Sequence, residues 1–324
     1  MKYVILGTGN ISNTYVQALE ALPASELVGC VSRSGKSPAA RRDLPTWPTL
    51  EAVTADFDAV IVATPNGLHS AGVIAAAQLG KHALTEKPLG IKKADMDQAI
   101  AACKANNLTL GVAYQRRTAP DNKAVKQLLE QGTLGRIFAA DLSAKFYRDQ
   151  AYYDSADYRG GFAIDGGGPF MQQACHNIDI YTWFFGMPTQ IHSFMGTFTH
   201  QIEAEDHGAA LLRYENGMIG TIIASTATKP GFAARLEVHS DLGSFTMVDD
   251  RITEWHFEAS PNPSDTQFHY AHDGATSASV SDSSAHQQII LDFEEAVRSG
   301  REPIASGVSA GLTSELILGI YGVA

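Results

Sequence analysis

The sequence predicts an α/β fold in which a doubly wound parallel sheet is followed by a second domain with a large, mostly antiparallel open sheet flanked by helices. Short apolar runs alternate with amphipathic helical runs over residues 1–117, which is the pattern of strand–helix–strand units. Residues 190–256 instead contain several strand-like runs, joined by turns such as Glu-Asn-Gly at residues 215–217. The expected domains are therefore residues 1–118 and residues 119–324.

Length and composition narrow the class of protein. A chain of 324 residues is long enough for two domains, and its hydrophobic fraction of 44% and charged fraction of 18% are those of a globular protein. The net charge of −11 argues against a nucleic acid or a membrane surface as partner, because both attract basic patches. The three cysteines and eleven histidines show neither a disulfide framework nor metal-ligand spacing. This spacing predicts no metal site. The N-terminal apolar run is too short for a signal peptide, so we expect a cytoplasmic protein.

A glycine-rich turn follows the first predicted strand, residues 3–6. The turn reads Gly-Thr-Gly-Asn-Ile-Ser and leads into an amphipathic helix, which is a GxGxxG pattern with serine in the third place. The first glycine permits a tight turn, and the second lets a pyrophosphate reach the free N–H groups at the helix N-terminus. This predicts a dinucleotide site of the Rossmann type, with an ordinary glycine turn as the alternative. The predicted cofactor contacts are Gly7, Thr8, Gly9, Asn10 and Ile11.

The second predicted strand, residues 27–31, ends where a ribose-binding residue is expected. An NAD-specific site usually carries an acidic residue there, whereas this chain has Ser32 and Arg33. Hydroxyl groups and a guanidinium suit a 2′-phosphate. The sequence therefore favours NADP(H) as cofactor, with NAD(H) as the alternative if the loop tolerates both.

The later strands of the first domain also end in polar residues. A short helix is expected near residues 50–54, and the buried strand of residues 58–63 leads into a loop that closes at His69. His69 is either a functional base or a structural hydrogen bonder. Because ligands bind at the carboxyl ends of parallel strands, residues after these strands are candidate cofactor contacts. These candidates are Thr64, Pro65, Asn66, His69 and Gln115.

The apolar run of residues 83–85 delivers Glu86 and Lys87 to the same edge of the sheet. Pro88 then ends the strand, because proline has no N–H to donate. A lysine in this place can perform acid/base chemistry, and Glu86 can contact the cofactor ribose or hold Lys87. The alternative is an exposed charged turn.

The second domain contains an aromatic, irregular segment at residues 150–165, followed by three glycines and a predicted helix over residues 170–185. On such a helix Gln172 and His176 share a face, and Asp179 lies one turn further on. His176 alone would more often be a buried core residue. The glycines at the helix start permit a close approach of a ligand or another domain, and this favours a site.

Together these motifs resemble the Gfo/Idh/MocA oxidoreductase family. The resemblance is carried by the glycine turn, the Thr-Pro pair at residues 64–65, the Glu-Lys-Pro run, the Tyr-Arg-Gly run at residues 158–160 and the run of residues 166–179. It implies hydride transfer between a nicotinamide cofactor and a carbinol or ketone carbon of a sugar, polyol or derivative. It also implies a dinucleotide-binding first domain, and a second domain that binds substrate and forms a homodimer or homotetramer through its sheet.

The resemblance further assigns roles to residues. Lys87 and His176 become the catalytic acid/base groups, Arg159 becomes a cofactor contact, and the Lys87–Pro88 bond is expected to be cis. One departure is clear: relatives usually carry an aspartate where this chain has Gln172, and an amide can orient a hydroxyl but cannot take its proton. The residues expected to orient the substrate are Tyr152, Gln172 and Asp179.

Two other activities remain open within this resemblance. One is a glycosidase that uses its nicotinamide only transiently, and the other is a non-catalytic NADP-binding regulator. The aromatic residues of the 150–165 segment also leave room for an aromatic dihydrodiol as substrate.

Overall fold

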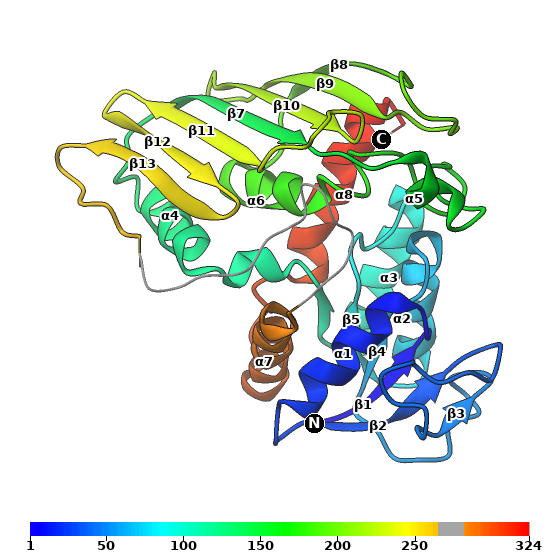
Figure 1. Ribbon diagram of the computed structural model, residues 1–324. Helices are drawn as coiled ribbons and strands as arrows, with labels where there is room; N and C mark the ends of the chain where they lie inside the picture. The colour runs from blue at the N-terminus through cyan, green and yellow to red at the C-terminus, as the bar shows by residue number, and fades with distance from the viewer. Residues whose placement is uncertain (265–281, 324) are drawn as a thin grey trace. The chain divides into compact units, whose positions relative to one another are not determined.

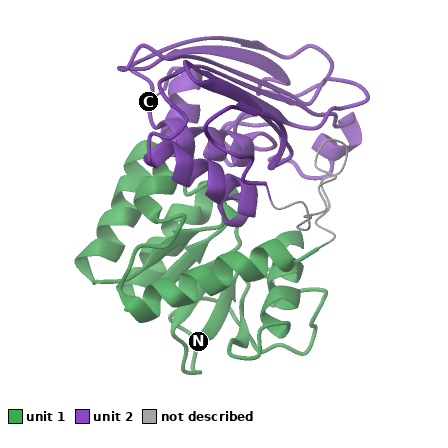
Figure 2. Cartoon of the chain, turned by 90° about the vertical axis from the view of Figure 1, so that its left-hand side faces the viewer, with its two compact units in different colours: residues 1–115, 280–311 green, residues 116–279, 312–324 purple. Residues whose placement is uncertain are grey.

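The computed structural model describes residues 1–264 and 282–323. The chain divides into two compact units, coloured separately in Figure 2. Unit 1 contains residues 1–115 and 280–311, and unit 2 contains residues 116–279 and 312–324. The chain first passes between the units after Gln115, near the boundary that the sequence placed at residues 118/119, and residues 280–311 return to unit 1.

In the part of the chain that the structure describes, unit 1 is built on a six-stranded sheet in the order β3-β2-β1-β4-β5-β6. All neighbouring strands are parallel, and this order is that of a doubly wound dinucleotide-binding fold. The predicted fold of the first domain is confirmed. The strands are β1 (Lys2–Leu6), β2 (Glu26–Val31), β3 (Thr46–Trp47), β4 (Ala59–Val62), β5 (His82–Thr85) and β6 (Leu110–Val112).

Helices cover both faces of this sheet (Figure 1). Helix α1 (Asn10–Glu20) packs with α7 (Ser284–Ser299), and α2 (His69–Gln78) packs with α3 (Lys93–Ala105). Every residue of β4 is buried, as expected for a central parallel strand with helices on both sides. The core on the α1 side includes Ile61, Leu84 and, from α7, Phe293.

The short helix predicted near residues 50–54 does not form. Residues 49–53 make only two i→i+3 backbone bonds, and the chain before them forms β3, which pairs with β2. The ring of Trp47 packs onto Gly29, so tightly that a Cβ there would collide with it. The chain just before the predicted helix is therefore anchored at the sheet edge.

The described part of unit 2 holds a seven-stranded sheet in the order β13-β12-β11-β7-β10-β9-β8. Neighbouring strands are antiparallel except for the parallel pair β7 and β10. The prediction of a large, mostly antiparallel sheet is confirmed. The strands are β7 (Ile137–Lys145), β8 (Gln190–Gly196), β9 (His207–Arg213), β10 (Ile219–Ser225), β11 (Arg235–Ser240), β12 (Gly243–Val248) and β13 (Arg251–Phe257).

One face of this sheet is covered by helices and the other is exposed. Helix α6 (Cys175–Phe185) packs against β7, and α4 (Pro120–Glu130) packs against α6 and β13 (Figure 1). The remaining helices are α5 (Gln150–Asp154) and α8 (Gly307–Tyr321), which passes from unit 1 to unit 2 after Gly311. Buried and exposed residues alternate along β9, as expected for a sheet with one buried face.

The helix predicted over residues 170–185 begins five residues late, at Cys175. Residues 169–174 form turns instead, in which the N–H of Gln172 bonds to the carbonyl of Gly168 and that of Ala174 bonds to the carbonyl of Pro169. This irregular bonding follows the glycine run and Pro169. Gln172 therefore stands on a turn, and the prediction that it shares a helical face with His176 is wrong.

Within residues 1–264 and 282–323, no helix is long and apolar enough to cross a membrane. In the same described residues, no cluster of three His, Cys, Asp or Glu side chains is arranged to hold a metal ion. All three cysteines are buried free thiols, as expected for core residues.

Candidate active site

The carboxyl edge of the unit 1 sheet gathers the polar residues that follow each strand. Because the strands are parallel, the segments after β1, β2, β4, β5 and β6 emerge at one edge. All the predicted cofactor contacts of unit 1 stand in these segments or at the start of the helix that follows. They are Gly7, Thr8, Gly9, Asn10, Ile11, Ser32, Arg33, Thr64, Pro65, Asn66, His69, Glu86, Lys87 and Gln115.

The glycine turn has the geometry of an anion cradle. Gly7 has a φ of +103°, and a Cβ there would lie 2.5 Å from the carbonyl oxygen of Ala63, so the ends of β1 and β4 approach closely only because residue 7 is glycine. A Cβ at Gly9 would meet nothing within 4 Å, so the space beside this backbone is open. Ser12 is buried and donates to the carbonyl of Gly9 at 2.6 Å.

Helix α1 begins directly after this turn and has no acidic residue in its first turn. Its N-terminal end therefore presents N–H groups and a partial positive charge without a competing carboxylate. The open backbone at Gly9 and this helix terminus fit the pyrophosphate of a dinucleotide.

Hydroxyl groups line the end of β2. Thr8 Oγ1 donates to Ser32 Oγ at 3.2 Å, and Ser32 Oγ lies 3.0 Å from Ser34 Oγ. The side chain of Arg33 is exposed beside them, and no carboxylate occurs between residues 32 and 37. Hydroxyl and guanidinium donors of this kind can bind a phosphate, whereas a ribose usually bonds to a carboxylate.

The ring of His69 lies between the segments that follow the neighbouring strands β4 and β5. Its Nδ1 lies 2.6 Å from the carbonyl oxygen of Pro88, and its Nε2 lies 2.7 Å from that of Thr64. Carbonyl oxygens only accept, so a neutral ring, which has a single N–H group, donates to one of the two, and which one depends on its tautomer. Burial lowers the pKa of His69, and the Pro88 carbonyl and the Glu86 carboxylate oppose that shift. With 1% of its surface exposed, His69 acts in this structure as a structural hydrogen bonder.

Glu86 is a buried carboxylate with partners from two helices. Its Oε1 accepts a bond of 2.7 Å from the hydroxyl of Tyr15 and lies 3.6 Å from Nε2 of His286. Its Oε2 accepts from the backbone N–H of Lys87 at 3.1 Å. Burial raises the pKa of Glu86, but His286, Lys87 and Tyr15 outweigh it, so that the pKa is lowered. The Glu86 side chain is thus held as a carboxylate beside Lys87.

Tyr15 and His286 were not among the residues that the sequence singled out. A signal existed for Tyr15, which stands on the buried stripe of α1 with Ser12 and Leu19, because a buried phenol needs a hydrogen-bond partner. His286 carries no such signal, since nothing local shows that α7 returns to unit 1.

Lys87 follows Glu86 at the end of β5, with its side chain half-buried. The Lys87–Pro88 peptide bond is cis, which confirms the expectation for this motif. The lysine therefore stands beside a carboxylate at the edge of the sheet where ligands bind, and not on an exposed turn.

In unit 2, the glycine run is explained by two side chains from distant parts of the sequence. A Cβ at Gly168 would collide with Glu205, and one at Gly167 would collide with the hydroxyl of Tyr321. The Glu205 carboxylate accepts bonds from the N–H groups of Gly168 and Phe170 at 3.1 and 3.3 Å and from the Tyr321 hydroxyl at 2.9 Å. Burial raises the pKa of Glu205, against which these bonds act. The close approach that the glycines permit is thus made by the protein itself.

The residues expected to act on substrate occupy different environments. Gln172 donates through Nε2 to the carbonyl of Asp165, and His176 is half-buried in the first turn of α6. Asp179 is completely buried, and its two oxygens accept from Arg117 at 2.6 and 2.9 Å and from Thr313 at 2.8 Å. Burial raises the pKa of Asp179, and Arg117 opposes that shift. These partners give Asp179 a structural role, in place of the substrate contact that was predicted.

Tyr152 and Arg159 lie together in unit 2. The guanidinium of Arg159 is 4.5 Å from the centre of the Tyr152 ring, and Gln173 Nε2 donates to the Tyr152 hydroxyl at 3.1 Å. This is a cation–π pair with a fixed phenol.

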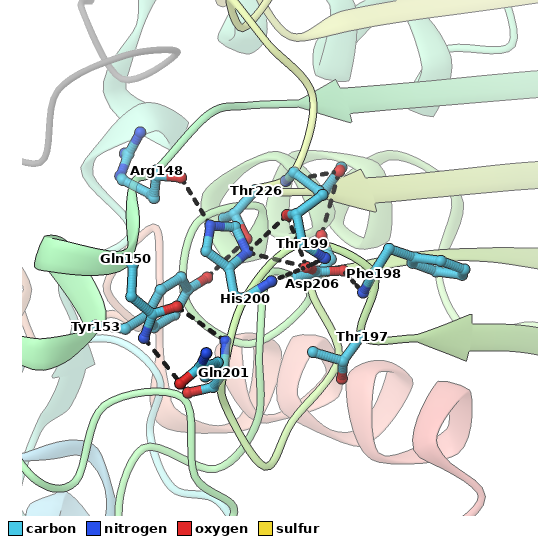
Figure 3. Close-up of polar contacts among 12 residues, drawn as sticks. Arg148, Gln150, Tyr153, Thr197, Phe198, Thr199, His200, Gln201, Asp206 and Thr226 are labelled. Carbon is cyan, nitrogen blue, oxygen red and sulfur yellow. Dashed lines mark hydrogen bonds and ion pairs between the residues drawn. The ribbon is translucent and has the colours of Figure 1, made fainter.

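The segment that carries Tyr152 is anchored by a polar cluster around Asp206 (Figure 3). The Asp206 carboxylate accepts from the N–H groups of Phe198 and Thr199 at 2.8 Å each and from the ring of His200 at 2.9 Å. Burial raises the pKa of Asp206, but these donors outweigh it and lower the pKa. The other ring nitrogen of His200 bonds to the carbonyl of Arg148 at 2.8 Å. The loop between β8 and β9 therefore fixes the start of the segment that leads to Tyr152.

Comparison with known families agrees with this geometry. The model described as "Oxidoreductase family, NAD-binding Rossmann fold" matches residues 1–114, and that of the GFO/IDH/MocA C-terminal domain matches residues 122–246. The chain belongs to the Gfo/Idh/MocA family. It is therefore an oxidoreductase with a nicotinamide-dinucleotide-binding domain in unit 1.

Among the relatives of this Gfo/Idh/MocA protein are two Bacillus subtilis enzymes. The scyllo-inositol 2-dehydrogenase (NAD(+)) is 25% identical over 98% of this chain and 92% of its own length. The scyllo-inositol 2-dehydrogenase (NADP(+)) IolW is 27% identical over 60% of this chain and 54% of its own length. A solved structure, the WlbA dehydrogenase from Bordetella pertussis in complex with NADH and UDP-GlcNAcA, is 28% identical, covers 100% of this chain and 96% of that one, and has a TM-score of 0.84.

Proposed function

We propose that this Gfo/Idh/MocA protein is an NADP(H)-preferring dehydrogenase or reductase that acts on a CH–OH or ketone carbon of a sugar, polyol or derivative. The observation that carries the proposal is the Glu86–Lys87 pair, which stands at the same sheet edge as the glycine turn. The relatives named above support the substrate class, since two are dehydrogenases of an inositol and one was solved with a sugar nucleotide.

The chain's own residues would bind the cofactor at the edge of unit 1. The N–H groups at the glycine turn would hold the pyrophosphate, and Ser32 with Arg33 would hold a 2′-phosphate. We propose further cofactor contacts from unit 1, namely Thr64, Pro65, Asn66 and Gln115. From unit 2 we propose Arg159 as a cofactor contact. His69 would contribute indirectly, because it fixes the backbone at Thr64 and Pro88.

A bound nicotinamide supplies or accepts the hydride, and the protein has to manage the proton. When an alcohol is oxidised, its hydroxyl proton must leave, and when a ketone is reduced a proton must be returned. We assign this exchange to Lys87 and His176, since an imidazole titrates near neutral pH and an ammonium can also polarise the oxygen. Gln172 and Tyr152 would orient the substrate through an amide and a phenol.

The cofactor preference is tested by titrating cofactor fluorescence with NADPH and NADH. We expect NADPH to bind more tightly, and Arg33→Ala to weaken NADPH binding about 10- to 100-fold while NADH binding stays unchanged, because a charge-assisted hydrogen bond is lost. Arg42→Ala, at an exposed arginine in the same region, is the matched control and should change neither affinity. Tighter binding of NADH by the unaltered protein would contradict the assignment of Ser32 and Arg33.

The same sample is then used to test the activity. Polyols and keto sugars are added one at a time, and turnover is measured as a change in the absorbance of the reduced cofactor. Turnover of a polyol or keto sugar is the expected result. Hydrolysis of an added glycoside without net change in absorbance would indicate the glycosidase, and tight cofactor binding without any turnover would indicate the regulator.

We also infer that the protein is a homodimer or homotetramer through the exposed face of the unit 2 sheet. Large apolar side chains stand on this face, namely Phe194 on β8, Leu211 on β9 and Ile219 on β10, which are 88%, 51% and 46% exposed. Such a patch is typical of an interaction surface. Sedimentation should show an oligomer that Phe194→Glu dissociates and that Leu242→Glu, in the turn between β11 and β12, leaves intact. A monomeric unaltered protein would contradict the inference.

A further inference from the structure

The peptide group that joins Glu86 to Lys87 is held on both sides. Its carbonyl oxygen accepts from the hydroxyl of Thr85 at 3.1 Å, and its N–H donates to the Glu86 carboxylate at 3.1 Å. Two residues further along, the carbonyl of Pro88 bonds to His69. The main chain on either side of the Lys87 side chain is therefore fixed by side chains, and one of them is the Glu86 carboxylate.

The Glu86 carboxylate is in turn oriented from two helices. Tyr15 on α1 donates to Oε1 at 2.7 Å, and Nε2 of His286 on α7 lies 3.6 Å from the same oxygen. The rings of Tyr15 and His286 also touch, edge to face, with their centres 5.2 Å apart. Among the described residues Nδ1 of His286 has no hydrogen-bond partner, so the polar contact of this buried ring is directed toward Glu86.

We propose that Tyr15 and His286 are positioning residues for Lys87, which they serve by holding the Glu86 carboxylate in the orientation that fixes the Lys87 main chain. The inference rests on the proposed acid/base role of Lys87. A buried carboxylate without these donors would turn toward other partners or take up a proton, since an unpaired buried charge is strongly disfavoured. Either change removes the acceptor for the Lys87 N–H.

Other charged groups also face this carboxylate and must be considered in a pH experiment. His69 on α2 and the Lys87 side chain act electrostatically on Glu86, and Asp282 at the start of the α7 segment acts on His286. None of these groups changes when Tyr15 becomes Phe or when His286 becomes Leu. Because His286→Leu also removes a titratable imidazole, a shift is assigned to Glu86 only when Tyr15→Phe, which leaves His286 and all these groups in place, causes it as well.

The test uses Tyr15→Phe, His286→Leu and His286→Gln, the last of which keeps an N–H donor near the position of Nε2. We expect Tyr15→Phe and His286→Leu each to lower kcat about 10- to 100-fold, because small displacements of a reacting group have effects of this size. His286→Gln should recover most of the loss. The acid limb of the kcat profile should move to higher pH in the two defective variants, since the loss of a donor makes Glu86 easier to protonate. The dissociation constant of the cofactor should stay unchanged.

Tyr3→Phe is the matched control. Tyr3 is also a fully buried phenol of unit 1, and it donates to a different buried carboxylate, that of Glu294, at 3.1 Å. Tyr3→Phe should lower the free energy of unfolding, as Tyr15→Phe does, but it should leave kcat and the pH profile of kcat unchanged. Equal losses of kcat in both tyrosine variants, or unchanged kcat in Tyr15→Phe and His286→Leu, would overturn the proposal. If Lys87→Ala keeps full turnover, the proposed role of Lys87 fails instead, so the two failures are distinguishable.

Discussion

Replacing Lys87 by alanine should lower kcat about 10²- to 10⁴-fold, which corresponds to roughly 3 to 5 kcal/mol of lost transition-state stabilisation. The side chain stands at the sheet edge beside a buried carboxylate, and its proposed work is to exchange or attract the proton of the reacting oxygen. Cofactor affinity should persist, because the glycine turn and the end of β2 remain intact. Steady-state kinetics together with a fluorescence titration of NADPH measure the two effects separately.

Lys87→Arg distinguishes between the two ways in which a lysine can act. An arginine stays protonated throughout the accessible pH range, so it can polarise an oxygen but cannot exchange a proton. Substantial activity in Lys87→Arg would indicate polarisation, and activity as low as that of Lys87→Ala would indicate proton transfer. Lys92→Ala, at an exposed lysine of the same unit, should behave as the unaltered enzyme. Unchanged turnover in Lys87→Ala would exclude the assignment.

Replacing Asp179 by alanine should destabilise unit 2 by about 3 to 5 kcal/mol, because it leaves the Arg117 guanidinium buried without its partner. Both side chains have no exposed surface, and they are joined by two hydrogen bonds of 2.6 and 2.9 Å. The guanidinium also lies 5.5 Å from the ring of Trp183. The expected result is a lower urea concentration at the midpoint of unfolding, measured by tryptophan fluorescence.

The control for this prediction removes the whole cluster. A variant with Arg117→Met, Asp179→Leu and Thr313→Val replaces the charges and the bonded hydroxyl with apolar groups, and such replacements are often close to neutral. It should be more stable than Asp179→Ala. If Asp179→Ala unfolds like the unaltered protein and only raises KM, the carboxylate would act on substrate as first predicted and the structural role would be wrong.

The sequence was most informative where local physics decides the structure. The apolar strands of unit 1 are buried on both faces, so they stand out as runs, and the glycine turn depends on a backbone angle that glycine alone adopts readily at Gly7. The residues after those strands were therefore placed correctly at one edge of a parallel sheet. The same local signals located Glu86, Lys87 and Pro88.

The sequence was least informative where partners come from distant segments. The glycines of residues 166–168 were interpreted as room for a ligand or a domain, but the side chains that fill that room are Glu205 and Tyr321. Asp179 looked like a site residue because its partners, Arg117 and Thr313, are 62 and 134 positions away. The late start of α6 follows from turn bonding among residues 168–174, which helical periodicity does not reveal.

The return of residues 280–311 to unit 1 sets the order in which the dinucleotide domain can mature. A ribosome produces the chain from its N-terminus, so every parallel strand, the glycine turn and Lys87 exist before α7 has been made. Until then the α1 side of the sheet lacks Phe293, Glu86 lacks His286, and Tyr3 lacks a partner that lies 291 positions later. The surroundings of Lys87 are therefore complete only after α7 has been synthesised, long after Lys87 itself.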